Sequence, residues 1–123
     1  MKFAKYTFGI AGIYGLLILI PQYFLEEKNG ADFPPAITHP EFYYGFIGVA
    51  LAFQVVFLII AKDPVKYRTM MLTAMIEKFS FVFALIVLFI QHRVASAMLI
   101  AGSIDLIFGS LFIAAYVKTR DSE

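Results

Sequence analysis

Four long apolar runs dominate the pattern of hydrophobic and polar positions along the chain. Each holds about 20 residues or more, the length that an α-helix needs to cross a bilayer. The runs are continuous and do not alternate between apolar and polar residues, as the strands of a membrane barrel would. We therefore predict an all-α fold: a single domain over residues 1–123, in which four transmembrane helices form an antiparallel bundle. The predicted spans are residues 6–25, 42–61, 70–90 and 94–117.

Prolines and short polar residues mark where these helices should begin and end. Pro21 should kink or end the first helix, because its ring clashes with the carbonyl of the residue four positions before it. Thr38 and Glu41 have the spacing of a capping box ahead of the second helix. Asp63 is followed by a proline, as an N-cap often is, which predicts that the third helix begins near residue 64. The link between the third and fourth runs is very short and predicts a tight antiparallel hairpin.

The composition indicates that the apolar runs face lipid. Apolar residues make up 61% of the 123 residues and charged residues 15%, whereas soluble domains average about 45–50% and about 25%. A chain this short has too little interior to hide so much apolar surface from water, so the lipid bilayer is its expected partner. The formal net charge of +1 gives no indication of nucleic-acid binding, and the lack of cysteine excludes disulfides and thiol chemistry.

The positive charges predict an orientation. If the chain has four spans, nearly all of its Lys and Arg residues outside the spans fall on the side that holds both chain ends. Membrane proteins carry their excess of Lys and Arg on the cytoplasmic side, so we predict that both termini are cytoplasmic. The opposite side has only Lys28 and Arg93. The charges on the predicted cytoplasmic side are Lys2, Lys5, Lys62, Lys66, Arg68, Lys118 and Arg120.

Small residues on two of the spans predict helix packing. Gly102 and Gly109 lie seven residues apart in the fourth span, and Gly45 and Gly48 lie on one face of the second. In lipid, helices associate through close packing of small residues. These glycines are therefore expected at contacts between helices, either within the bundle or in a homo-oligomer or larger membrane complex.

The sharpest feature is a set of polar residues deep in the predicted spans. Asp105 lies about 20 Å along its helix from Lys118, near the middle of a hydrocarbon core that is about 30 Å thick. Glu77 and Gln54 lie about 12–13 Å deep by the same rise, and Lys78 adjoins Glu77. An acid at such depth normally needs a partner, water or a proton. Gln54, Glu77, Lys78 and Asp105 are therefore candidates for a ligand-binding or proton-binding site; a polar clamp that sets helix register explains the same residues.

Signals for other chemistry are weak. His39 lies near several acids of the outer loop, but without the spacing of metal ligands, so no metal site is predicted. The serines of the spans have no histidine at a similar depth, so no hydrolytic triad is supported. We predict no catalytic residue and no cofactor, because no nucleotide-binding or nucleophile motif is present.

Four segments resemble a family of small four-span bacterial inner-membrane proteins that has no assigned activity. In size and span count the chain is also similar to DoxX-like proteins. The resemblance covers most of the chain after residue 38 and implies a bacterial inner-membrane location, without implying a ligand or an activity. The segments are THPEFYYG at 38–45, DPVKYR at 63–68, EKFS at 77–80 and DLIFG at 105–109.

Three functions are compatible with these features. The leading hypothesis is a non-enzymatic membrane protein that binds a small apolar or amphiphilic ligand, or a membrane partner, at the polar residues within the spans. The second is a structural or accessory subunit that forms an oligomer through its glycine faces. The third is a small membrane enzyme or proton-coupled carrier.

Overall fold

The computed structural model describes residues 2–120, and helices form most of them without any strand in this range. The all-α fold predicted from the sequence is confirmed. Within residues 2–120, five α-helices and one 3-10 helix follow one another. They are α1 (Lys2–Leu19), η1 (Ile20–Phe24), α2 (Glu26–Asp32), α3 (Pro40–Lys62), α4 (Met70–Ile90) and α5 (Met98–Lys118).

Four of these segments are long and apolar enough to cross a membrane, as an integral membrane protein requires. The first consists of α1 together with η1, and the others are α3, α4 and α5. Pro21 does end the α-helix: α1 stops at Leu19, and the chain continues as a 3-10 helix to Phe24. A proline removes one backbone donor and blocks the carbonyl four residues earlier, so the tighter 3-10 geometry takes over.

The predicted beginnings of two helices were wrong. The third helix does not begin near residue 64, because residues 64–69 form turns; α4 starts at Met70 and ends at Ile90, the bounds predicted for the third span. Asp63 still acts as a cap, but of a turn, since its Oδ1 accepts a hydrogen bond from the backbone N–H of Lys66 at 3.2 Å. The capping box of Thr38 and Glu41 is not formed, because the N-cap of α3 is the residue after Thr38 and makes no side-chain capping bond.

The hairpin between α4 and α5 is longer than predicted. The fourth span was expected from residue 94, but α5 begins at Met98, and residues 91–97 make the reversal. His92 has a φ of 59° in this turn, a left-handed conformation that an L-residue adopts only in turns and similar places.

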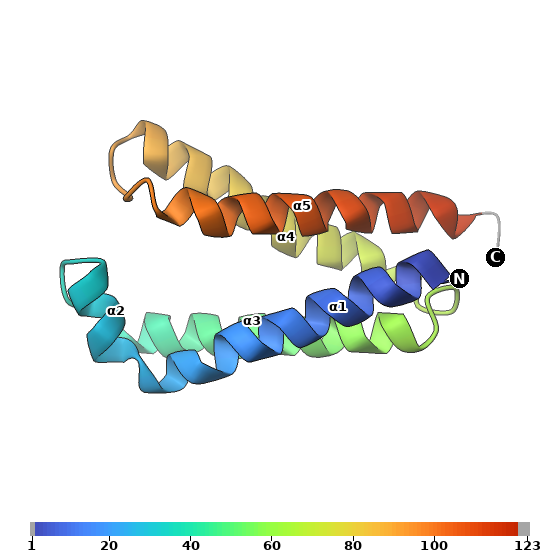
Figure 1. Ribbon diagram of the computed structural model, residues 1–123, viewed down its shortest axis with the longest axis horizontal. Helices are drawn as coiled ribbons and strands as arrows, with labels where there is room; N and C mark the ends of the chain where they lie inside the picture. The colour runs from blue at the N-terminus through green and yellow to red at the C-terminus, as the bar shows by residue number, and fades with distance from the viewer. Residues whose placement is uncertain (1, 121–123) are drawn as a thin grey trace.

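The helices form two pairs. Helix α1 packs mainly against α3, and α4 packs mainly against α5. Contact between the pairs runs chiefly through α1 and α5, and α3 touches α4 less. Figure 1 shows that the pairs approach each other at the end where α1 begins and α5 ends, and diverge towards the end that holds α2 and the α4–α5 turn.

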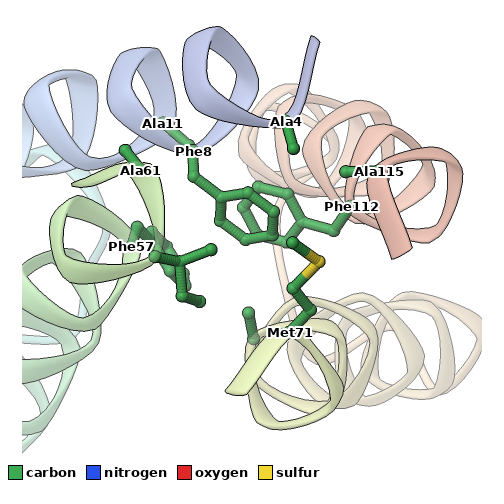
Figure 2. Packing of buried hydrophobic residues seen from close by; sticks show 10 residues of the cluster. Ala4, Phe8, Ala11, Phe57, Ala61, Met71, Phe112 and Ala115 are labelled. Atoms are coloured by element: carbon green, nitrogen blue, oxygen red, sulfur yellow. The ribbon is translucent and has the colours of Figure 1, made fainter. Parts of the chain in front are cut away.

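The hydrophobic core lies at the end where the pairs meet. Phe8 of α1 stacks on Phe112 of α5 with ring centroids 4.2 Å apart, and Phe57 of α3 meets Phe112 edge-on at 5.0 Å. Met71 of α4 completes the contact, and none of these four side chains is exposed. Figure 2 shows the four helices meeting around these rings. Alanines at the closest approaches let large aromatic side chains fill the centre at the density of a protein interior.

Arg68 ties the α3–α4 connection to the end of α5. Its Nε donates to the carbonyl oxygen of Tyr116 at 3.0 Å and to Thr119 Oγ1 at 3.1 Å, and its Nη2 donates to the same carbonyl at 2.9 Å. The guanidinium also lies 3.7 Å from the centroid of the Tyr116 ring. The last carbonyls of a helix have no partner within the helix, so this arginine supplies donors that the end of α5 lacks.

The opposite end of the first pair is held by side chains of the loop that contains α2. The Tyr43 hydroxyl donates to the carbonyl oxygen of Gln22 at 2.6 Å, and Asn29 donates to Gln22 Oε1 and to the Tyr43 hydroxyl. Tyr44 donates to Glu26 Oε1 at 3.0 Å. These bonds fasten η1 and α2 onto α3, and they leave the space between the two helix pairs uncovered.

Candidate functional site

The charged residues that the sequence analysis selected meet between α4 and α5. Lys78 Nζ donates a hydrogen bond to Asp105 Oδ1 at 3.1 Å. The same nitrogen lies 3.7 Å from Glu77 Oε2. Lys78 and Glu77 are neighbours on α4 and leave the helix in directions about 100° apart, but the long lysine side chain brings its nitrogen back beside the carboxyl. An ammonium and two carboxyls therefore form one cluster.

Lys78 points into the bundle and does not extend to the membrane surface. Its side chain is only 8% exposed. The Nζ atom lies 5.4 Å from the ring centroid of Phe57 and 5.7 Å from that of Phe108, distances at which an ammonium is attracted to an aromatic face. The core rings on one side and Asp105 on the other thus hold the charge in place.

Gln54 brings a polar group from α3 to the same region. The residue is 3% exposed, and its Nε2 donates to the carbonyl oxygen of Ala50 at 2.8 Å. Its side chain occupies the space that a Cβ at Gly15 of α1 would need. Glycine at position 15 is therefore required for α1 to pack closely against this glutamine.

Two buried oxygens in this region lack a hydrogen bond. They are Oε1 of Gln54 and Oε2 of Glu77, the buried side-chain atoms without a partner among residues 2–120. Both are acceptors. An unsatisfied buried acceptor costs about 1–3 kcal/mol, and a protein normally removes that cost with a donor from elsewhere.

A cavity of about 590 Å³ lies between α3 and α4, and we call it the α3–α4 groove. It is open at the surface of the bundle, along the helices of the two pairs that contact each other least. Helix α4 contributes three polar side chains to it, Thr73, Glu77 and Ser80, and α5 contributes Asp105. The lining residues are Phe46, Val49, Ala50, Phe53, Thr73, Ile76, Glu77, Ser80, Phe81 and Asp105.

A second cavity of about 170 Å³, the inner cavity, lies further inside the bundle. It is more enclosed than the groove and is bordered by all four residues of the predicted site: Gln54, Glu77, Lys78 and Asp105. Phe46, Ala50, Phe81 and the two carboxylates line both spaces, so the inner cavity adjoins the groove. Together they form a path from an apolar opening to a polar interior.

The four predicted packing glycines fall in different surroundings. A Cβ at Gly102 would lie 2.6 Å from Leu85, and a Cβ at Gly109 would lie 2.9 Å from Phe79, so both glycines allow α5 to approach α4 closely. Gly45 and Gly48 are exposed on α3. A Cβ at Gly45 would meet no atom within 4 Å, and one at Gly48 would meet only the Tyr23 hydroxyl at 3.7 Å, so neither glycine marks a close approach of helices within this chain.

The sequence analysis did not identify several residues that shape the site. Two of them, Gly15 and Tyr14, belong to α1. Both line or border the inner cavity, and the ring of Tyr14 lies 5.6 Å from that of Phe108. The phenylalanines of the groove carried no signal at all, because phenylalanine is common throughout an apolar span.

The described residues offer little for other chemistry. Within residues 2–120, no group of three His, Asp or Glu side chains lies close enough together to hold a metal ion. His39 pairs with Glu41 at 3.1 Å on the surface, far along α3 from the cluster. The arrangement that remains can hold a molecule by its shape and charge.

Comparisons with models of protein families, with curated proteins and with solved structures give no match to this chain. Evidence for a function therefore comes from the geometry of the groove and the cluster.

Proposed function

We propose that this integral membrane protein binds a small amphiphilic molecule that reaches the α3–α4 groove from the bilayer. The observation that supports this most directly is the groove itself, an open apolar cavity lined by the Glu77 carboxyl, one oxygen of which accepts no hydrogen bond. Its volume lies within the range of about 300–1,000 Å³ that is usual for small-molecule sites. No step of this proposal requires a catalytic residue.

The walls and the end of the groove match the two parts of an amphiphile. Phe46, Phe53 and Ile76 on its walls would contact a hydrocarbon tail. Glu77 and Asp105, where the groove adjoins the inner cavity, would meet a polar head. Lipid-soluble molecules concentrate in the bilayer, so an opening between helices gives them direct access.

A purely structural role explains only part of the cluster. The bond between Lys78 and Asp105 joins α4 to α5 and would hold the helix register without any other charge. Glu77 adds a second acid that this clamp does not need. A carboxyl inside a membrane costs about 2.5–3.5 kcal/mol on insertion scales, and a ligand that pairs with Glu77 would account for keeping it there.

We further propose that the protein resides in a bacterial inner membrane with both termini in the cytoplasm. The beginning of α1 and the end of α5 lie at the same end of the bundle (Figure 1), and Lys118 Nζ lies 4.4 Å from the ring centroid of Phe3. The excess of Lys and Arg at this end favours the cytoplasmic side. The bacterial location follows from the family resemblance of the segments between residues 38 and 109.

A blocked groove tests the binding function. Ser80 and Ser103 are both exposed, and each donates its hydroxyl to a carbonyl of its own helix, but Ser80 alone of the two lines the groove. The probe is a photoreactive medium-chain alcohol, added to the protein in lipid vesicles. We expect Ser80→Phe to lower labelling of groove residues about tenfold, equivalent to about 1.4 kcal/mol of binding free energy, and Ser103→Phe to leave it unchanged. Uniform labelling of all lipid-facing helices that Ser80→Phe does not alter would contradict the function.

A further inference from the structure

We infer that the molecule bound in the α3–α4 groove carries a cationic head with hydrogen-bond donors, such as a primary amine in its ammonium form, which binds against Glu77. This inference rests on the proposed function and specifies the ligand class of the same site. Three independent features support it: the kind of atom left unsatisfied, the balance of charge, and the surroundings of the lysine.

The unsatisfied atoms require a donor. Oε1 of Gln54 and Oε2 of Glu77 are both acceptors that receive no hydrogen bond, although Lys78 Nζ lies 3.7 Å from the Glu77 oxygen, and their side chains border the inner cavity. A carboxylate or sulfate head would bring more acceptors to a place that already has too many. An ammonium brings N–H donors and no acceptor, so it supplies what both side chains lack.

The charge balance favours a cation. Lys78 contributes one positive charge, and Asp105 and Glu77 contribute two negative charges when both are ionised. Lys78 Nζ lies 3.1 Å from Asp105 and 3.7 Å from Glu77, so one ammonium serves two carboxylates and one negative charge is left in excess, with Glu77 the more weakly paired of the two. In surroundings of low polarity an uncompensated charge is costly, and a bound cation would neutralise it.

The surroundings of Lys78 disfavour an anion. Its nitrogen already donates to Asp105 and lies over the rings of Phe57 and Phe108, and its side chain is 8% exposed. An anionic head in the groove would therefore meet the carboxyls before the ammonium. The rings of Phe46 and Phe81 line both cavities and add aromatic faces, which attract ammonium groups.

A series of probes with the same hydrocarbon tail and different polar head groups tests the inference. The probes are photoreactive medium-chain molecules that differ only at the end: a primary amine, an alcohol and a carboxylate. Each is titrated against the protein in zwitterionic vesicles, and the half-saturating concentration is read from the labelling of groove residues. We expect the amine to bind about tenfold more tightly than the alcohol, and the carboxylate to bind most weakly.

Two variants connect this preference to the site. Glu77→Gln removes the excess charge at nearly constant size, and we expect the amine-to-alcohol ratio to fall to about one. Glu27→Gln removes an exposed carboxyl from α2 and should leave the ratio as it is in the original protein. If Glu77→Gln does not fold, Gln54→Leu is the second variant, and we expect it to reduce the ratio because it removes the other unpaired acceptor.

The outcomes separate this inference from the function on which it rests. If all three probes label the groove equally, or if the carboxylate binds best, the inference of a cationic ligand is wrong. The proposed binding function would still stand. An amine preference that persists in Glu77→Gln would also overturn the inference, because it would reflect partition into the bilayer alone. If no probe labels the groove in a way that Ser80→Phe reduces, the binding function itself fails.

Discussion

Lys78 shows at the scale of one residue how its neighbours decide the position of a charge. A lysine about halfway along a span can extend its side chain to the headgroups, and the sequence left this alternative open. In the structure the side chain turns inward, because Asp105 accepts its hydrogen bond at 3.1 Å and two phenylalanine rings lie within 6 Å. The lysine thus compensates an acid that would otherwise lie uncompensated inside the bundle.

Removal of this ammonium should destabilise the protein strongly. Lys78→Met keeps the length of the side chain but leaves Asp105 and Glu77 without a cation. We expect a loss of about 3 kcal/mol in the free energy of unfolding, measured by reversible denaturation in mixed micelles. The double variant Lys78→Met with Asp105→Asn should recover most of the loss, because the two residues act as one pair.

The control for this prediction is Lys62→Met, which alters an exposed lysine in the last turn of α3. Changes at exposed positions usually remain within about 0.5 kcal/mol. The ion pair would have no structural importance if Lys78→Met lost no more stability than the control.

At the scale of the elements, local signals placed the helices well but their ends less well. Pro21 ended α1 as predicted, since its effect depends only on the residues before it. Asp63 capped a turn instead of α4, because the chain must cross from one helix pair to the other before it can enter the bundle again. Helix α2 was not predicted, although two glutamates in its first turn and a Lys28–Asp32 pair at 2.7 Å support it.

The end of α5 should depend on Arg68, which reaches it from the α3–α4 connection. Arg68→Lys keeps the charge but cannot bond both the carbonyl of Tyr116 and Thr119 in the same planar geometry. We expect a loss of about 1–2 kcal/mol and faster hydrogen exchange of the last amides of α5. Exchange by mass spectrometry on protein in nanodiscs measures this.

The matched variant for this test is Lys66→Arg, which exchanges the same two residue types at an exposed position of the same connection. Its exchange should equal that of the original protein. Unchanged exchange at the end of α5 in Arg68→Lys would show that the clamp does not hold the helix.

At the scale of the whole molecule, the chain is a pair of hairpin-like units joined at one end. The core of Phe8, Phe57, Met71 and Phe112 (Figure 2) lies towards the end of the bundle where α1 begins and α5 ends, and the charged cluster and the groove extend from there towards the end where the pairs diverge (Figure 1). A wide opening near the middle of the spans therefore coexists with a closed end.

Single cysteines test the orientation of this closed end, because the chain has no cysteine of its own. Cysteine at Lys5 or Lys66 should react with a membrane-impermeant maleimide only after cells are opened, since we place these exposed residues in the cytoplasm. Cysteine at Glu27 or Arg93 should react in intact cells. All four residues are exposed, so accessibility within the bundle does not bias the comparison.

Two results would contradict the proposed orientation. If cysteines introduced at positions 5 and 66 were labelled from opposite sides of the membrane, the number of spans would not be four. If the cysteine introduced at position 27 were labelled only after lysis, the bundle would have the opposite orientation in the membrane.

The sequence was enough to predict which residues enter the membrane-spanning helices and which polar side chains lie deep within them. The length of a run, its continuous hydrophobicity and the positions of prolines are local properties. Transfer into lipid is favourable for each apolar side chain, whichever helices lie beside it. The four helices therefore followed from the order of the residues, as did the candidates Gln54, Glu77, Lys78 and Asp105.

Only the tertiary structure decided which of these side chains meet and where space remains between helices. Helical periodicity gives a direction around one axis but no partner, so the pairing of Lys78 with Asp105 depended on how α4 and α5 cross. The α3–α4 groove depended on the tight packing of α1 with α3 and of α4 with α5, which leaves α3 and α4 apart. Such contacts between distant segments arise from the packing of whole helices, which no local pattern records.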